Sequence, residues 1–188
     1  MRIGLISDTH IPSMAAAPPP EVEQAFKGVD LIFHAGHAYT PDAIEWLSRI
    51  TPVEWTESSM QGSGESWSHI SRLRVLELEG HTIGLTHELI LTSLPDDILP
   101  GAIDRSFPKN KSLPDALERV FGKPVDIVVF GYTHQALVET HDGILMVNPG
   151  SPNLVRQEVR LGTVAILEIT PDSRDAWIVD LAQFSPPA

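Results

Sequence analysis

The chain has 188 residues and a formal net charge of −12, because 13 lysines and arginines oppose 25 aspartates and glutamates. Its length fits one domain, and 42% hydrophobic with 20% charged residues is typical of a globular protein rather than a disordered or membrane-spanning one. The sequence has no cysteine, which excludes disulfides, thiolate metal sites and cysteine nucleophiles. An acidic chain without a basic cluster disfavours nucleic-acid and membrane partners, and the absence of a leader-like segment predicts a cytoplasmic protein.

The first part of the chain predicts alternating strands and helices. Continuous short apolar runs are typical of strands buried on both faces, whereas Thr40 followed by Pro41 resembles a helix N-cap with proline in the first turn. The expected strands are 3–6, 31–34 and 53–56, and the expected helices are 21–26 and a segment from Pro41 through Leu47. Such alternation predicts a mainly parallel sheet with right-handed crossovers.

The second part predicts hairpins around a long irregular segment. The expected hairpins pair 75–78 with 82–85 and 136–140 with 144–147; a helix covers 113–121, and further strands cover 126–130, 163–169 and 176–180. Residues 88–111 contain three prolines and little periodicity, and so long an irregular segment inside one domain is usually functional or mobile. We therefore expect a single domain over residues 1–188, with a lid or insertion at 88–111.

Residues that can bind a metal follow four of the predicted buried strands. In sheets with parallel strands, the carboxyl ends meet at one edge, where ligands bind. A lone histidine at a strand end is more often capped or solvated than a ligand, but repetition at four strand ends favours a site. Imidazole and carboxylate together suit Zn, Mn, Fe or Ni better than Ca. The candidates are Asp8 and His10, then His37, then His87, then Tyr132 and His134.

Three other histidines receive separate interpretations. His34 lies inside a predicted strand, so we expect a core side chain with its hydrogen bonds satisfied. His81 and His141 lie beside predicted hairpin turns, and we expect both to be solvated.

Five short motifs occur in the order and spacing of the calcineurin-like metallophosphoesterases, and the chain most resembles the small YfcE-like phosphodiesterases. The motifs are Ile6-Ser7-Asp8-Thr9-His10, His34-Ala35-Gly36-His37, Leu85-Thr86-His87, Phe130-Gly131-Tyr132-Thr133-His134 and Asn148-Pro149-Gly150-Ser151. The resemblance runs from residue 1 to about residue 180. It implies a four-layer α/β/β/α sandwich in which two metal ions, often Mn, Fe, Zn or Ni, lie at the strand ends. It also implies hydrolysis of a phosphate ester by a metal-bound hydroxide.

Several residues depart from the family pattern at the ligands themselves. The resemblance makes Asp8, His10 and His134 ligands of the first metal, and His87 a ligand of the second. At three positions the usual ligand is replaced: His37 stands for the bridging aspartate, Ser63 for an asparagine, and Tyr132 for the first histidine of a Gly-His-x-His motif.

These replacements predict one divalent ion rather than two. A neutral imidazole offers one lone pair, so His37 cannot bridge two cations as a carboxylate does. Ser63 and Tyr132 are weak ligands of a second site unless they are ionised. We therefore expect a single Mn, Zn, Fe or Ni ion with His37 as the fourth donor, and a water in its place if His37 moves away. The catalytic candidates are His37 and Glu65, and either Glu65 or Glu88 could act as a base or restore a carboxylate ligand.

The sequence leaves three functions open. The first is a metal-dependent phosphoesterase that hydrolyses a small phosphorylated substrate with a weakened second metal site. The second is a catalytically impaired member that binds a protein as a scaffold, as the related small retromer subunit does. The third is a mononuclear metallohydrolase of another substrate. A homo-oligomer is compatible with each.

Overall fold

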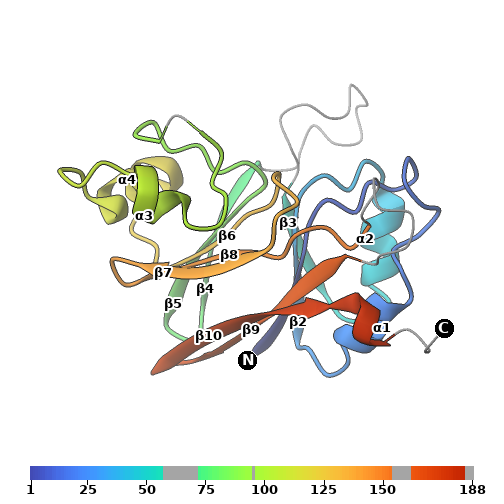
Figure 1. The fold of residues 1–188 in the computed structure, drawn as a ribbon. Helices are drawn as coiled ribbons and strands as arrows, with labels where there is room; N and C mark the ends of the chain where they lie inside the picture. Colours follow the sequence, from blue (N-terminus) through green and yellow to red (C-terminus); the bar gives the residue numbers. More distant parts are fainter. Residues whose placement is uncertain (57–71, 95, 154–161, 185–188) are drawn as a thin grey trace.

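The protein, a computed structural model that describes residues 1–56, 72–94, 96–153 and 162–184, is built on two five-stranded sheets (Figure 1). The first sheet has the order β10-β9-β1-β2-β3 and the second the order β4-β5-β6-β8-β7. The first contains β1 (Arg2–Ile6), β2 (Leu31–Ala35), β3 (Val53–Thr56), β9 (Thr163–Thr170) and β10 (Ser173–Asp180). The second contains β4 (Leu73–Leu78), β5 (His81–Thr86), β6 (Ile127–Val129), β7 (Leu137–His141) and β8 (Ile144–Asn148).

The strand pairing differs from a mainly parallel sheet. The pairs β1–β2, β2–β3, β5–β6 and β6–β8 are parallel, whereas β1–β9, β9–β10, β4–β5 and β7–β8 are antiparallel. The parallel pairing expected for the alternating units is confirmed for β1, β2 and β3, but neither whole sheet is mainly parallel, because hairpins add antiparallel strands beside each parallel core. The strand β10 also begins three residues earlier than expected, where it forms a hairpin with β9.

Helices cover the outer face of each sheet, which gives the four-layer sandwich expected from the sequence (Figure 1). The short helices α1 (Glu21–Ala25) and α2 (Pro41–Leu47) lie on the first sheet, and α3 (Ala102–Ser106) and α4 (Leu113–Phe121) lie on the second. A 3-10 turn, η2 (Leu181–Phe184), follows β10. No helix within the described ranges is long and apolar enough to cross a membrane.

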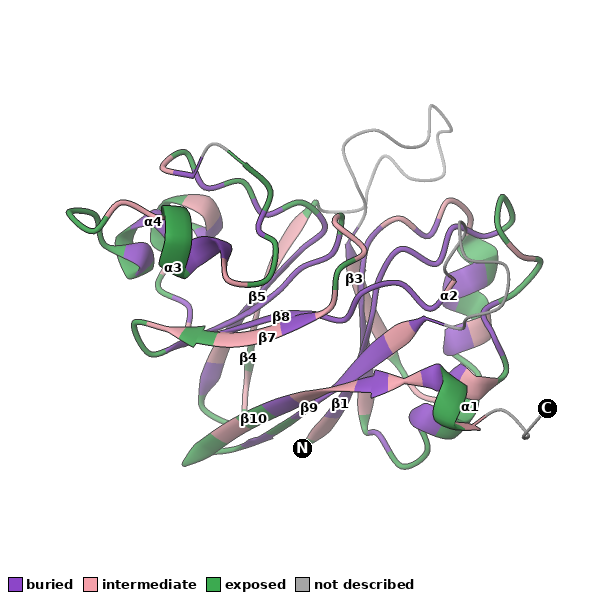
Figure 2. Cartoon of the chain, in the orientation of Figure 1, coloured by how far each residue is buried: buried purple, intermediate pink, exposed green. Residues whose placement is uncertain are grey.

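The alternation of side chains along the strands explains why the short apolar runs are buried on both faces. Ile3 and Leu5 of β1 face the core between the two sheets, whereas Ile6 faces the outer core with Phe26 after α1. Gly4 allows close packing there, since an added Cβ would lie 2.9 Å from the Phe26 ring. Figure 2 shows that the central strands are buried, that the edge strands are partly exposed, and that each helix carries both buried and exposed residues.

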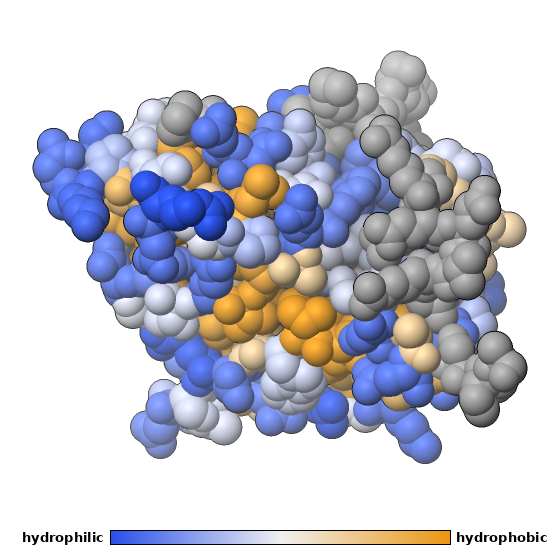
Figure 3. Space-filling model, viewed as in Figure 1, coloured by the Kyte–Doolittle hydropathy of each residue, from blue (hydrophilic) through white to orange (hydrophobic). Residues whose placement is uncertain are grey.

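The face seen in Figure 3 has apolar side chains in its middle, over the region where β7 and β10 lie next to each other. Val138 of β7 and Ile178 of β10 are partly buried and pack against the core between the sheets. The sandwich is therefore closed on this side by the edge strands themselves, and hydrophilic residues surround the apolar area.

The segment 88–111 is anchored to the second sheet by buried apolar residues. Leu89, Leu91, Leu94 and Ile98 belong to the same core cluster as Leu117 of α4. Helix α4 is capped at its N-terminus, because Ser112 Oγ accepts a hydrogen bond from Asp115 N at 3.1 Å.

The structure confirms one expectation about the isolated histidines and corrects two. His34 is fully buried, with Nε2 3.1 Å from Thr9 Oγ1 and Nδ1 accepting from Gly36 N at 3.2 Å. His81 and His141 are not solvated, because neighbouring segments fold over the hairpin ends. The ring of His141 lies between Glu139 and Asp104, at 2.9 and 3.2 Å.

His81 links the ends of three strands. Its Nδ1 lies 2.6 Å from Asp126 Oδ2 and its Nε2 lies 2.9 Å from the carbonyl oxygen of Thr170. The hydrogen bond with Asp126 raises the pKa of His81 and outweighs burial, which lowers it. Both ring nitrogens face acceptors, so the protonated ring satisfies both.

We expect His81→Gln to reduce the free energy of unfolding by about 1 kcal/mol more at low pH than at high pH. Because the folded-state pKa is raised, the stabilisation is fully present below the unfolded-state pKa and is lost as pH rises through the folded-state pKa. Urea unfolding of the parent and variant at about pH 5.5 and about pH 8.5 measures the difference. An equal loss at both pH values would show that the charge on His81 contributes nothing.

Candidate metal centre

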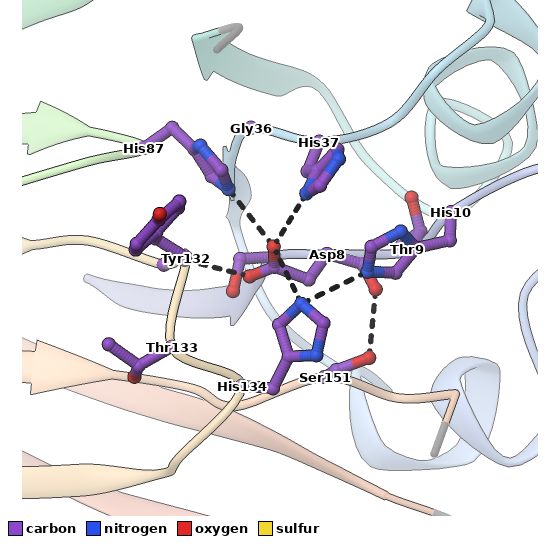
Figure 4. Close-up of polar contacts among 12 residues, drawn as sticks. Asp8, Thr9, His10, Gly36, His37, His87, Tyr132, Thr133, His134 and Ser151 are labelled. Atoms are coloured by element: carbon purple, nitrogen blue, oxygen red, sulfur yellow. Dashed lines mark hydrogen bonds and ion pairs between the residues drawn. The ribbon is translucent and has the colours of Figure 1, made fainter. Parts of the chain in front are cut away.

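The centre lies where four loops leave β1, β2, β5 and β6 at one edge of the sandwich (Figure 4). Backbone hydrogen bonds continue the parallel pairing beyond the strand ends and hold the loops side by side. Asp8 N donates to Gly36 O at 3.0 Å, and His10 N donates to His37 O at 3.1 Å. In the second sheet, Gly131 N donates to His87 O at 2.9 Å. The positions selected from the sequence therefore do converge.

The residues that turn into the centre have left-handed backbone conformations. The φ angles are 54° for Asp8, 53° for His10, 65° for His37, 76° for Tyr132 and 57° for His134. Residues with a Cβ rarely adopt this region, which costs roughly 1–2 kcal/mol each. Asp8 and His10 both have this conformation, and both side chains of the Asp-x-His motif point into the centre (Figure 4). Strain concentrated on these positions is typical of a functional site.

Asp8 is the buried centre of the cluster, with no exposed surface. Its Oδ1 lies 3.0 Å from His87 Nε2, 3.1 Å from His37 Nδ1 and 3.3 Å from His134 Nε2 (Figure 4). Its Oδ2 accepts a hydrogen bond from the backbone N–H of Tyr132 at 3.1 Å. One carboxylate thus contacts groups from three other loops.

The protonation of the cluster follows from burial and these contacts. Burial opposes the charge on Asp8, but hydrogen bonds with His134, His37 and His87 outweigh it and hold the pKa of Asp8 well below its ordinary value. Burial and the neighbouring His37 lower the pKa of His10 to about 4. The hydrogen bond to Asp8 raises the pKa of His134. At neutral pH the centre therefore contains a carboxylate and a neutral His10 imidazole, which are the ionisation states that bind metals.

The donor atoms match the spacing that a metal ion requires. Asp8, His10, His37 and His134 each offer one ligand atom, and these atoms lie within 4.8 Å of one another. His10 Nε2 lies 3.1 Å from His134 Nε2. Nitrogen ligands 2.0–2.1 Å from a tetrahedral zinc ion are about 3.3 Å apart, so this pair is already at ligand spacing. The four residues therefore fit a transition-metal ion.

His87 lies beside this set rather than within it. It is 2% exposed, and its Nδ1 is a buried atom with no hydrogen-bond partner. Such a group costs about 1–3 kcal/mol, so its position is maintained by the contact of its other nitrogen with Asp8. Figure 4 shows His87 and His37 approaching Asp8 from the same side.

Of the three remaining candidates, the structure describes only Tyr132. Tyr132 is 45% exposed, and its ring centroid lies 5.7 Å from that of His87. Its contact with Asp8 is made by the backbone rather than by the hydroxyl. Ser63 and Glu65 lie outside the described residues.

The residues 148–153 form a brace whose role was not predicted from the sequence. Asn148 Nδ2 donates to Gly131 O at 2.9 Å, and Ser151 Oγ donates to Asp8 O at 2.8 Å. Asn153 Nδ2 donates to Thr9 O at 2.7 Å. One segment thus fixes both the Asp8 loop and the 131–134 loop. The family motif Asn148-Pro149-Gly150-Ser151 was the only sequence signal for it.

Two glycines allow the loops to approach so closely. Gly36 has a φ of 83°, and an added Cβ would lie 2.5 Å from the Cβ of His87. An added Cβ on Gly131 would lie 2.8 Å from Asp8 Oδ2. A side chain at either position would separate the loops that carry the ligands.

Comparisons with known proteins agree with this arrangement. Residues 1–172 match the calcineurin-like phosphoesterase superfamily domain. The chain is 30% identical over 181 residues to a protein of Methanothermobacter thermautotrophicus named "Probable metallophosphoesterase", covering 95% of this chain and 92% of that one.

Two solved structures share the fold at 18% identity. One is wild-type Vps29 of Entamoeba histolytica complexed with Zn²⁺, with a TM-score of 0.66 over 96% of this chain and 99% of that one. The other is described as a novel archaeal phosphodiesterase, with a TM-score of 0.61 over 95% of this chain and all of that one (100%).

We expect zinc to stabilise the protein and Asp8→Asn to remove the effect. Zinc at 100 times its dissociation constant contributes about 2.7 kcal/mol, which raises the melting temperature of a chain this long by about 5–10 °C. Asp8→Asn preserves the size of the side chain but removes the charged ligand at the centre. Thermal unfolding with and without zinc measures this, with elemental analysis of the dialysed protein. An unchanged zinc response in Asp8→Asn would place the ion elsewhere.

Proposed function

We propose that this chain, which belongs to the calcineurin-like phosphoesterase superfamily, is a metal-dependent hydrolase of a small phosphate ester. The observation that supports this most is the convergence of Asp8, His10, His37 and His134 from separate loops to ligand spacing. The protein of Methanothermobacter thermautotrophicus and the archaeal phosphodiesterase carry names of the same reaction class.

We propose Asp8, His10 and His134 as the principal ligands of one divalent transition-metal ion, with His37 as the fourth. When bound, such an ion would lower the pKa of a water molecule and offset the charge that develops on the phosphoryl oxygens. Asp8 supplies the only carboxylate of the described cluster, and this carboxylate is fully buried.

His37 is the residue whose role decides whether the centre is catalytic. Its side chain is 22% exposed and that of His134 is 37% exposed, whereas Asp8 is fully buried, so both imidazoles lie on the solvent side of the cluster. If His37 stays bound, four protein ligands fill a tetrahedral ion; if it moves outward, a position opens for water or substrate. An unbound His37 would also lie close enough to exchange a proton with the reacting group, with Glu65 as the second candidate for that role.

A protein-binding scaffold is the second candidate function. It is favoured by the imidazole at position 37, which replaces a bridging carboxylate, and by the shared fold with Vps29. In this case the ion would stabilise the loops without any turnover, since a closed four-ligand site is typical of structural zinc.

Hydrolysis of bis(p-nitrophenyl) phosphate and p-nitrophenyl phosphate tests the proposal. Water forms a bond to phosphorus while the P–O bond to p-nitrophenol breaks, and the released nitrophenolate is measured by its absorbance. With Mn, Zn, Fe or Ni we expect turnover that falls at least about 100-fold in His134→Ala, because a ligand is lost.

His141→Gln is the matched control, since His141 is a partly buried histidine whose partners are Glu139 and Asp104. It should retain the parent activity. A metal-loaded parent that hydrolyses neither ester would contradict the enzymatic proposal and favour the scaffold or a hydrolase of another substrate class.

A further inference from the structure

A cavity of about 220 Å³ adjoins the candidate metal centre on the side of the second sheet. It lies between two segments, one within the irregular stretch 88–98 and the other the loop 130–133 that follows β6. Its volume is below the roughly 300–1,000 Å³ of pockets that bury drug-sized ligands, so it suits a group of a few carbon atoms.

The cavity and the metal centre share a wall. Gly131 lines the cavity, and its Cα lies so close to Asp8 that an added Cβ would be 2.8 Å from Oδ2. Tyr132 also lines the cavity, and its ring packs edge-on against His87. Gly131 and Tyr132 therefore border both the cavity and the metal centre, and an ester arm that reaches the cavity from the metal centre has to pass Tyr132.

The lining of the cavity combines aliphatic side chains with carboxylates. Leu89, Ile90 and Leu91 provide apolar contact, and Ile90 is 61% exposed. The charged residues on the wall are Glu88, Asp96 and Asp97. No lysine or arginine is among the described residues that line it.

We propose that this cavity binds an ester arm that is a short aliphatic alcohol with an ammonium group. The inference rests on the proposed phosphoesterase function and names the class of its substrate. Aliphatic walls accept the methylene and methyl groups, and the acidic residues attract the positive charge. The same carboxylates repel a second phosphate, so nucleoside polyphosphates and other multiply charged anions are disfavoured.

Two esters of matched shape isolate the charge. p-Nitrophenyl phosphocholine carries the ammonium arm, and p-nitrophenyl 3,3-dimethylbutyl phosphate carries the same arm with carbon in place of nitrogen. We expect kcat/KM to be about fivefold to tenfold higher for the cationic ester at low salt, and the ratio to fall as salt screens the carboxylates. In D96N/D97N the ratio should fall toward one, because only Glu88 remains charged on the wall, whereas Glu118→Gln, an exposed carboxylate change on α4, should leave the ratio as in the parent.

Ile90→Ser tests the apolar wall separately and costs little folding stability, because Ile90 is exposed. It should raise KM for both esters to a similar extent. A ratio near one in the parent, or a ratio that D96N/D97N does not change, would overturn the proposal.

Calorimetric binding of phosphocholine and 3,3-dimethylbutyl phosphate to the zinc-loaded protein separates the two proposals. A preference for phosphocholine that D96N/D97N abolishes, without turnover of any ester, would contradict the proposed hydrolase but support the cavity assignment. Turnover of both esters without a preference in rate or binding would overturn the cavity assignment and leave the hydrolase in place. Neither turnover nor preferential binding would overturn both.

Discussion

One buried carboxylate organises this end of the molecule. Asp8 has no exposed surface, yet its Oδ1 lies 3.0–3.3 Å from nitrogens of His37, His87 and His134. A buried charge without partners would cost several kcal/mol. The carboxylate of Asp8 therefore depends on the loops that bring these imidazoles within hydrogen-bond distance of it. The same arrangement presents several nitrogen lone pairs and one anion to a shared point, which is what a transition-metal ion binds.

The rest of the fold maintains a set of conformations that are unfavourable on their own. Asp8, His10, His37 and His134 have left-handed φ angles. The continued backbone pairing of the loops and the 148–153 brace offset the conformational cost of these angles. These contacts start from strands whose side chains fill the core between the sheets. The centre is therefore held by elements far apart in the sequence, and its geometry depends on the sandwich as a whole.

Two different patterns in the sequence predicted the strands and the position of the site. Continuous apolar runs identified β1, β2 and β6, and ligand-type residues after them identified the edge where they meet. Antiparallel pairing of β1 with β9 could not be predicted from local patterns, because it joins segments more than 150 residues apart. The burial of His81 likewise depends on the β9–β10 turn, with Thr170 as its partner. The sequence revealed the 148–153 brace only as a family motif, and its role could not be predicted. Hydrogen bonds from side chains to distant backbone carbonyls leave no periodic pattern in the sequence.

Anomalous diffraction at the zinc absorption edge, from crystals of the zinc-loaded protein, tests most directly whether these loops form a metal centre. The account predicts one strong peak about 2.0–2.3 Å from ligand atoms of Asp8, His10 and His134, with His37 as the fourth ligand or a water in its position. No peak among these residues, or a peak bound only by side chains elsewhere on the surface, would contradict it.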